Sequence, residues 1–116
     1  MNEDTMGEQL AKWGKVALLE SRGRVSGQTV TSAVGFVEDR DGGLLVAAGA
    51  EDADWALNLR QTPTCKATVA DETRQYEAVE LAADERNQAI TQLILKYGTP
   101  AERLGRGPAF RLRRRD

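Results

Sequence analysis

Two short segments carry residue types that could bind a ligand. The first is the glycine-bounded segment Arg22–Gln28, in which Arg24 and Ser26 lie between Gly23 and Gly27. Glycine permits positive φ angles, and successive exposed N–H groups in such a turn form a concave anion-binding surface. The segment could therefore cradle a phosphate, although an ordinary turn with a surface arginine has the same composition.

The second segment runs from Trp55 to Pro63 and contains Trp55 and Asn58 three residues apart. Residues three apart share one face of a helix, so a short helix could present both side chains to a ligand. The alternative is a core tryptophan with an asparagine near a helix end. Tyr97 is a third candidate, either as a proton donor or as a core residue at the end of a helix.

Bulk composition limits the chemistry. The chain has 116 residues, of which 41% are hydrophobic and 29% charged, with a net charge of −2, no histidine and Cys65 as the one cysteine. We expect one globular domain over residues 1–116, without an internal disulfide. The absence of histidine removes the commonest general base and metal ligand, so no metal site is expected. The weak net charge and the lack of a long apolar run argue against nucleic-acid binding and a transmembrane segment.

The hydrophobic pattern predicts a mainly β protein. Periods of two residues indicate strands, and apolar residues three and four apart indicate helices. A cluster of aspartate and glycine predicts a hairpin turn at Asp39–Gly43, and Asp52 or Asp54 is a candidate helix N-cap. The expected strands are Val16–Glu20, Thr29–Glu38, Leu44–Ala48, Lys66–Ala70, Arg74–Leu81 and Pro108–Leu112, and the expected helices are Glu8–Lys15, Trp55–Gln61 and Ala83–Tyr97. Antiparallel hairpins with few, short helices favour a small barrel.

Several of these segments resemble one family. The Gly23–Gly27 turn after the first strand, the strand end Val46-Ala47-Ala48 and the segment Trp55–Pro63 are similar to the deazaflavin-dependent nitroreductases, or F-420-dependent quinone reductases. The resemblance covers Leu18–Val79. It implies a split β-barrel of about six antiparallel strands with two to three short helices, an α+β fold.

The resemblance also implies an activity. Members of that family bind coenzyme F-420, a deazaflavin, and pass hydride from it to quinones or nitro compounds. The cofactor carries this chemistry, so the missing histidine is no objection. Tyr97 is the nearest match to the family's tyrosines and is the candidate catalytic residue. The implied cofactor-binding residues are Arg24, Ser26, Gly27, Ala48, Gly49, Trp55, Asn58 and Arg60.

Three of the family's basic positions differ in this sequence. Val25, Val30 and Gly49 replace them, and Ala33 replaces a proline. Arg22, Arg24 and Arg60 are candidate replacements for the lost charges. FMN as the cofactor, or no cofactor, is the alternative. A non-catalytic protein that binds a flavin, haem or apolar ligand is the second hypothesis, and a small domain that pairs through an edge strand is the third.

Other expectations concern the setting of the protein. A lone thiol fits the reducing cytoplasm, and Cys65 is expected as a strand-edge thiol without a partner. The sequence leaves open whether the protein forms a homodimer. The arginine-rich segment Arg111–Arg115 fits an edge strand with a solvated face, or a loose tail, better than a nucleic-acid contact.

Overall fold

Alternating burial along the strands explains the sheet. In β1 (Ala17–Arg22), Ala17, Leu19 and Ser21 are buried, and the residues between them are half-buried or exposed. Successive side chains on a strand point to opposite faces, so β1 buries one face only. The computed structural model describes residues 14–98 and 106–115. The expected helix Glu8–Lys15 lies mostly outside the described residues.

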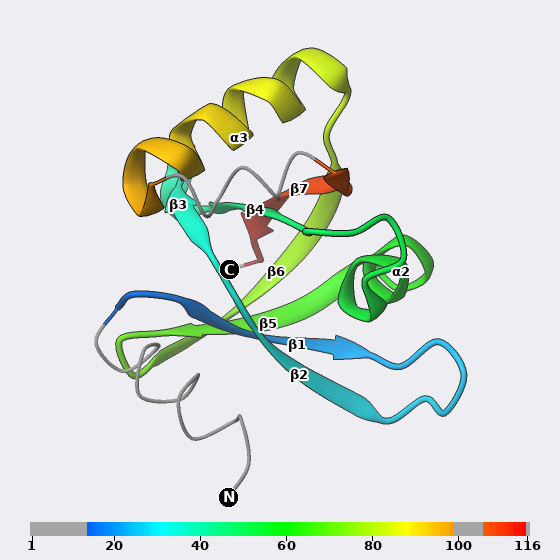
Figure 1. Ribbon diagram of the computed structural model, residues 1–116. Coiled ribbons are helices and arrows are strands. Elements are labelled where there is room, and N and C mark those ends of the chain that lie inside the picture. Colours follow the sequence, from blue (N-terminus) through cyan, green and yellow to red (C-terminus); the bar gives the residue numbers. More distant parts are fainter. Residues whose placement is uncertain (1–13, 99–105, 116) are drawn as a thin grey trace, which may run out of the picture.

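Seven strands form one antiparallel sheet in the order β2-β1-β5-β6-β7-β4-β3 (Figure 1). The remaining strands are β2 (Thr29–Val34), β3 (Phe36–Glu38), β4 (Leu44–Ala47), β5 (Thr64–Val69), β6 (Glu72–Glu80) and β7 (Ala109–Arg114). Because β2 and β3 follow each other in the sequence but lie at opposite ends of this order, the sheet curls into a half-barrel. The expectation of a mainly β fold with two to three short helices is confirmed, since the described residues contain two α-helices.

Gly35 divides the expected strand Thr29–Glu38 into two. A Cβ atom at Gly35 would lie 3.3 Å from the ring of Tyr97, so the chain passes close beneath this tyrosine. The prediction that the whole strand pairs with the strand after the hairpin turn is therefore wrong in part. Only β3 pairs with β4, whereas β2 pairs with β1. This break makes seven strands where about six were expected.

The last strand also differs from its prediction. β7 pairs with β6 on one side and with β4 on the other, so it is neither an edge strand nor a loose tail. Arg111 in this strand donates to Asp39 at 2.6 Å and to Glu85 at 3.0 Å. These contacts join β7 to the hairpin turn, which contains a short 3-10 helix (Arg40–Gly42), and to α3. The arginines of this segment therefore serve at least partly to hold the fold together.

Two helices cover the sheet. α2 (Asp54–Gln61) and α3 (Ala83–Tyr97) begin without a side-chain cap. The expectation that Asp52 or Asp54 caps α2 is therefore wrong. Asp54 is instead the first residue of α2. The bounds of α3 agree with the periodicity of the sequence, and Gly98, with a φ of +88°, ends it. Neither helix is long and apolar enough to cross a membrane, and the same holds for the rest of the described chain.

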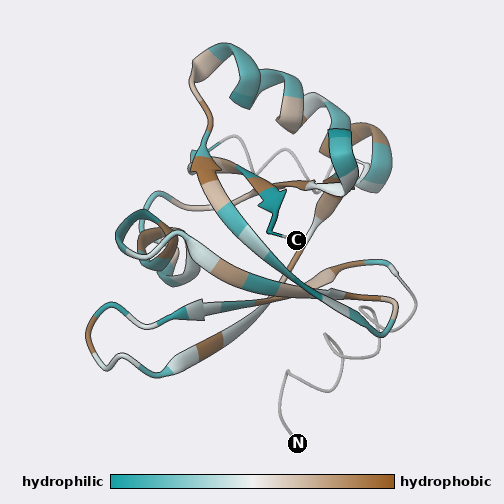
Figure 2. Ribbon diagram, turned by 180° about the vertical axis from the view of Figure 1, so that it is seen from behind, coloured by the Kyte–Doolittle hydropathy of each residue, from teal (hydrophilic) through white to brown (hydrophobic). Residues whose placement is uncertain are grey.

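The core has two parts, and both are mainly aliphatic. One fills the curl of the sheet beneath α2, and the other lies between α3 and the sheet. Figure 2 shows hydrophobic positions alternating with hydrophilic ones along the strands. The first part contains Leu19, Val46, Trp55, Leu59 and Phe110 among its buried residues. This packing fixes α2 against β1 and so determines where the β1–β2 turn can lie.

Candidate functional site

The β1–β2 turn is closed by its own backbone. The N–H group of Gly23 donates to the carbonyl of Gln28 at 2.8 Å, and that of Gly27 donates to the carbonyl of Gly23 at 2.9 Å. Gly27 has a φ of +75°, which favours glycine. Ser26 is exposed, and its Oγ accepts from the Gln28 N–H at 3.1 Å. In this conformation the N–H groups of both glycines serve the turn rather than a bound phosphate.

The turn is bonded to α2 through Arg24 and Asn58. Asn58 is 1% exposed, and its Oδ1 accepts from the backbone N–H of Arg24 at 3.1 Å and from the guanidinium at 2.9 Å. Its Nδ2 donates to the hydroxyl of Ser21 at 3.2 Å. The Arg24 guanidinium also contacts the side chain of Asp54 at 3.2 Å. The turn and Asn58, which the sequence places on opposite sides of a slot for a planar ring, are instead in direct contact.

Trp55 belongs to the core. It is 9% exposed, and its ring lies 6.0 Å from that of Phe110, centroid to centroid. This is the core alternative considered for the sequence. Ala48 is buried and donates to the carbonyl of Pro108 at 2.9 Å, while Gly49 is exposed where the chain leaves β4 toward α2. Ala48 and Gly49 therefore lie on the connection that leads to the start of α2.

Arg60 is held away from the turn. Its guanidinium donates to both carboxylate oxygens of Glu80, at 2.8 and 2.7 Å. These hydrogen bonds to Glu80 raise the pKa of Arg60, and the same bonds lower the pKa of Glu80. A bidentate pair of this kind fixes the guanidinium in one orientation. Arg60 therefore joins the end of α2 to β6 and does not replace a charge lost near the turn.

Tyr97 fastens α3 to the sheet. Its hydroxyl donates to the carbonyl of Lys15 at 2.6 Å and accepts from the N–H of Phe36 at 3.1 Å. The ammonium group of neighbouring Lys96 donates to the carbonyl of Phe36 at 2.8 Å and lies 3.6 Å from the centre of the Phe36 ring. These contacts occupy the phenol and tie it to the start of β3. The described residues give Tyr97 no contact with the β1–β2 turn.

Replacing Tyr97 with phenylalanine should lower the free energy of unfolding by about 1 to 2 kcal/mol, because the Phe36 N–H loses its acceptor. Urea denaturation followed by circular dichroism measures this change. The rate of hydride transfer per folded molecule serves as the second measurement. Wild-type stability combined with a large loss of rate would instead support the catalytic role that the resemblance implies.

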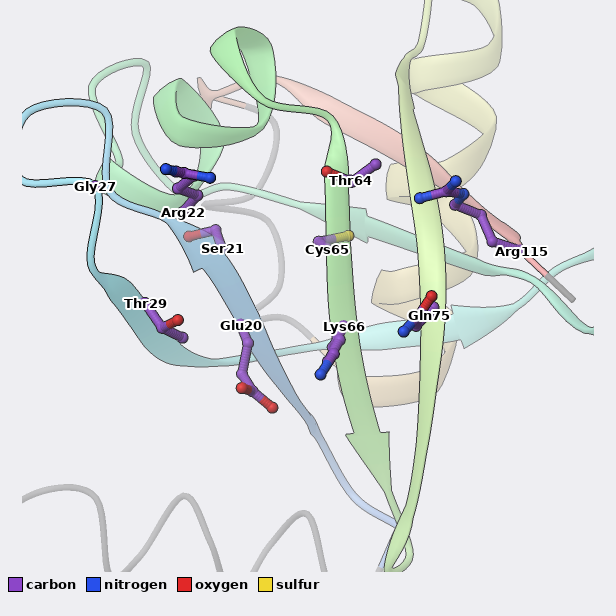
Figure 3. Close-up of a pocket in the computed structure, with 10 residues that line it drawn as sticks. All are labelled: Glu20, Ser21, Arg22, Gly27, Thr29, Thr64, Cys65, Lys66, Gln75 and Arg115. Atoms are coloured by element: carbon purple, nitrogen blue, oxygen red, sulfur yellow. The ribbon is translucent and has the colours of Figure 1, made fainter.

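A groove with cationic walls lies beside the turn. It has a volume of about 400 Å³ and crosses β1, β5 and β6. Figure 3 shows its ten lining residues: Glu20, Ser21, Arg22, Gly27, Thr29, Thr64, Cys65, Lys66, Gln75 and Arg115. Three of them are cations and one is a carboxylate, so the groove is positive in a chain whose net charge is −2.

Sequence analysis identified Arg22 and Gly27 from this groove but missed Lys66 and Arg115. Strand register brings the lining residues together, since Glu20 of β1 is opposite Lys66 of β5 and Lys66 is opposite Gln75 of β6. No local pattern in the sequence gives that register. Only the alternation of polar residues along the hairpin of β5 and β6 indicated an exposed face there.

Cys65 differs from its prediction as a strand-edge thiol. It lies in β5, between β1 and β6, and is 7% exposed. Burial raises the pKa of its thiol to about 12. A thiol in this state is protonated at neutral pH, and the thiolate is the reactive form. Across residues 14–98 and 106–115 no group of three or more acidic or cysteine side chains is arranged to hold a metal ion.

The curled antiparallel sheet with two covering helices defines the class of fold. The fold is similar to that of HutZ, a heme storage protein from Vibrio cholerae. The two chains are 20% identical and have a TM-score of 0.75, and the match covers 100% of this chain and 92% of that one. An F420-H2 dependent reductase, FDR-A, is 21% identical with a TM-score of 0.70, covering 84% of this chain and 93% of that one. A protein described as a domain-swapped dimer is 20% identical with a TM-score of 0.69, covering 94% and 95%.

The family follows from the sequence itself. Residues 1–104 match the model of the F420H(2)-dependent quinone reductase family, and the chain belongs to this family. Membership implies coenzyme F-420 as the cofactor. None of the curated proteins matches the chain.

The described residues fit one part of that cofactor. A deazaflavin carries a flat ring, a phosphate and a carboxylate-rich tail, and the cationic groove suits the anionic part. The ring needs a slot, but Trp55 is packed on Phe110 and Asn58 is bonded to Ser21 and Arg24. In this conformation neither side chain of that pair is open to a ring.

Proposed function

We propose that the protein is an oxidoreductase that uses reduced coenzyme F-420 to deliver hydride to a quinone-like or nitro-type acceptor. The match of residues 1–104 to the family carries this proposal. The positive groove beside the β1–β2 turn supports it, because an anionic cofactor needs cations near its phosphate and carboxylates. Arg24, Ser26, Gly27, Ala48, Gly49, Trp55 and Asn58 remain the proposed surroundings of the cofactor.

The bound cofactor supplies the hydride, and the chain positions it. Arg24 and Asn58 hold the turn on α2, so the backbone at Ser26 and Gly27 has a fixed position relative to Ala48 and Gly49. Arg22 lies beside the turn and can bind an anionic group. Trp55 supports the start of α2 from the core. A site of this kind requires no histidine, since the protein orients the reactants and excludes water.

A binding protein without turnover is the second candidate. The replacement of basic residues by Val25, Val30 and Gly49 favours it, because each lost cation weakens the contact with an anionic cofactor. The solved structure of HutZ is described as a heme storage protein, and its fold is similar. Haem is the weaker ligand for this chain, because the sequence has no histidine and the Tyr97 hydroxyl is bonded to the backbone.

Titration with F-420 and measurement of its fluorescence distinguish these candidates. We expect quenching at micromolar protein, followed by acceptor-dependent oxidation of reduced F-420 when menadione is added without oxygen. Parallel titrations with FMN and haemin serve as controls. Binding of F-420 without turnover of any quinone or nitro compound would favour the second candidate. Absence of F-420 binding together with tight FMN or haem binding would reject the proposal.

The setting of the protein is also proposed. We infer a cytoplasmic setting, because a single cysteine that can form no internal disulfide fits a compartment where thiols stay reduced. We also infer that two copies could associate, since one solved neighbour is described as a domain-swapped dimer. Sedimentation of the full chain over a range of concentrations tests this inference.

A further inference from the structure

The cations of the groove lack the ion pairs that four other described arginines form. Arg24, Arg60, Arg74 and Arg111 each form an ion pair with a carboxylate. Among the described residues, Arg22, Lys66 and Arg115 form no such pair, although all three line one groove. With three cations and one carboxylate the groove keeps a surplus of positive charge, and a bound anion would offset it.

The groove has further groups that bind anions. Thr29 and Thr64 bring hydroxyl groups and Gln75 brings an amide, all of which can donate to an oxygen. Glu20 is the one carboxylate, and it lies opposite Lys66 across the β1–β5 pair. The walls therefore carry a surplus of positive charge and of donors. Figure 3 shows that these side chains come from β1, β2, β5, β6 and the end of the chain.

The groove lies on a different face from the contact between the turn and α2. Glu20 and Arg22 flank Ser21 in β1, and the Ser21 hydroxyl bonds to Asn58 of α2. Because neighbouring side chains on a strand point to opposite faces, Glu20 and Arg22 point away from α2. Gly27 lies where the two faces meet, since a Cβ at this glycine would lie 3.9 Å from the Arg22 guanidinium. An anionic chain could pass from one face to the other around this exposed glycine.

We propose that the groove of Arg22, Lys66 and Arg115 is a binding site for a phosphate- or polycarboxylate-bearing group. Its ligand has two sources with the same chemistry. One is the anionic tail of F-420, bound around the edge of the turn, and this source rests on the proposed function. The other is a separate phosphorylated small molecule, and this source does not rest on the proposed function.

Charge variants of opposite sign test the site. Lys66→Gln and Arg22→Gln each remove a cation, Glu20→Gln removes the carboxylate, and Arg40→Gln removes an exposed cation at the β3–β4 turn outside the groove. Tripolyphosphate is titrated into each full-length variant by calorimetry. We expect about a tenfold loss of affinity for each lost cation of the groove, a gain for Glu20→Gln and no change for Arg40→Gln. Equal affinities in all four variants would overturn the proposal.

Two deazaflavins then distinguish the sources. F-420 and 8-hydroxy-5-deazariboflavin share the ring, but only F-420 has the phosphate and tail. If the tail occupies the groove, Lys66→Gln weakens F-420 binding about tenfold and leaves the tailless compound unchanged. If F-420 binds equally to wild type and variant while tripolyphosphate does not, the groove takes a separate anion. Failure of wild type to bind either deazaflavin would reject the proposed function and leave the tripolyphosphate result standing.

Discussion

Replacing Asn58 with leucine should lower the free energy of unfolding by about 3 kcal/mol. Asn58 is 1% exposed and makes three hydrogen bonds, two to Arg24 and one to Ser21. Leucine would leave the Arg24 N–H and the Ser21 hydroxyl without this partner, and each unsatisfied buried polar group costs about 1 to 3 kcal/mol. The midpoint and slope of a urea denaturation curve measure the loss.

Asn58→Asp is the matched control. Its carboxylate has the same shape and still accepts from Arg24, and the Ser21 hydroxyl can rotate to donate to it. We expect a smaller loss than for leucine. Asp54→Asn is a second control, because Asp54 is 79% exposed on its side chain and exposed ion pairs contribute about 0 to 1 kcal/mol.

The same variants separate two roles of Asn58. If Asn58 mainly holds the turn on α2, loss of cofactor affinity in Asn58→Leu should be accompanied by loss of stability. If its main role is contact with the cofactor, affinity should fall while the denaturation midpoint stays at the wild-type value. That second pattern would contradict the structural role argued from its buried hydrogen bonds.

Local signals in the sequence were sufficient for several elements. The periodicity of Ala83–Tyr97 gave α3 with the bounds observed, because the apolar stripe and the glycine that ends the helix are both local. Pro63 correctly marked the end of α2. The break at Gly35 was missed because it depends on Tyr97, a residue far along the chain that packs against this glycine. Pairing of β2 with β1 follows from that break.

The site was predicted only in part, because its contacts also join residues that are far apart in the sequence. The sequence indicated that the β1–β2 turn and Asn58 face each other across a slot for a planar ring, whereas these groups are in direct contact. It could not show that the Arg24 side chain itself fills this contact, or that Arg60 is paired with Glu80. Long arginine side chains reach many partners, so their choice depends on the tertiary structure.

Raising the pH should destabilise the protein through Cys65, and the loss should reach about 2 kcal/mol by about pH 10.5. Burial raises the pKa of this thiol to about 12 in the folded state, whereas the unfolded chain exposes a thiol of pKa about 8.5 to 9. Below pH 8 both states keep the proton, so the stabilising effect is fully present. Above about pH 9 only the unfolded state releases it, and stability falls by about 1.4 kcal/mol per pH unit until the folded pKa is reached.

Cys65→Ala isolates this effect from the titration of other side chains. At pH 7 the variant should be less stable than wild type by about 1 kcal/mol, because alanine leaves a small cavity in the core around β5. Its stability should fall less steeply with pH, so the two curves of unfolding free energy against pH should cross near about pH 10. Parallel curves for wild type and variant between about pH 8 and 10.5 would contradict a buried, protonated thiol. In that case β5 would have to open readily enough for water to reach Cys65, and the groove beside it would be less rigid than its strand pairing implies.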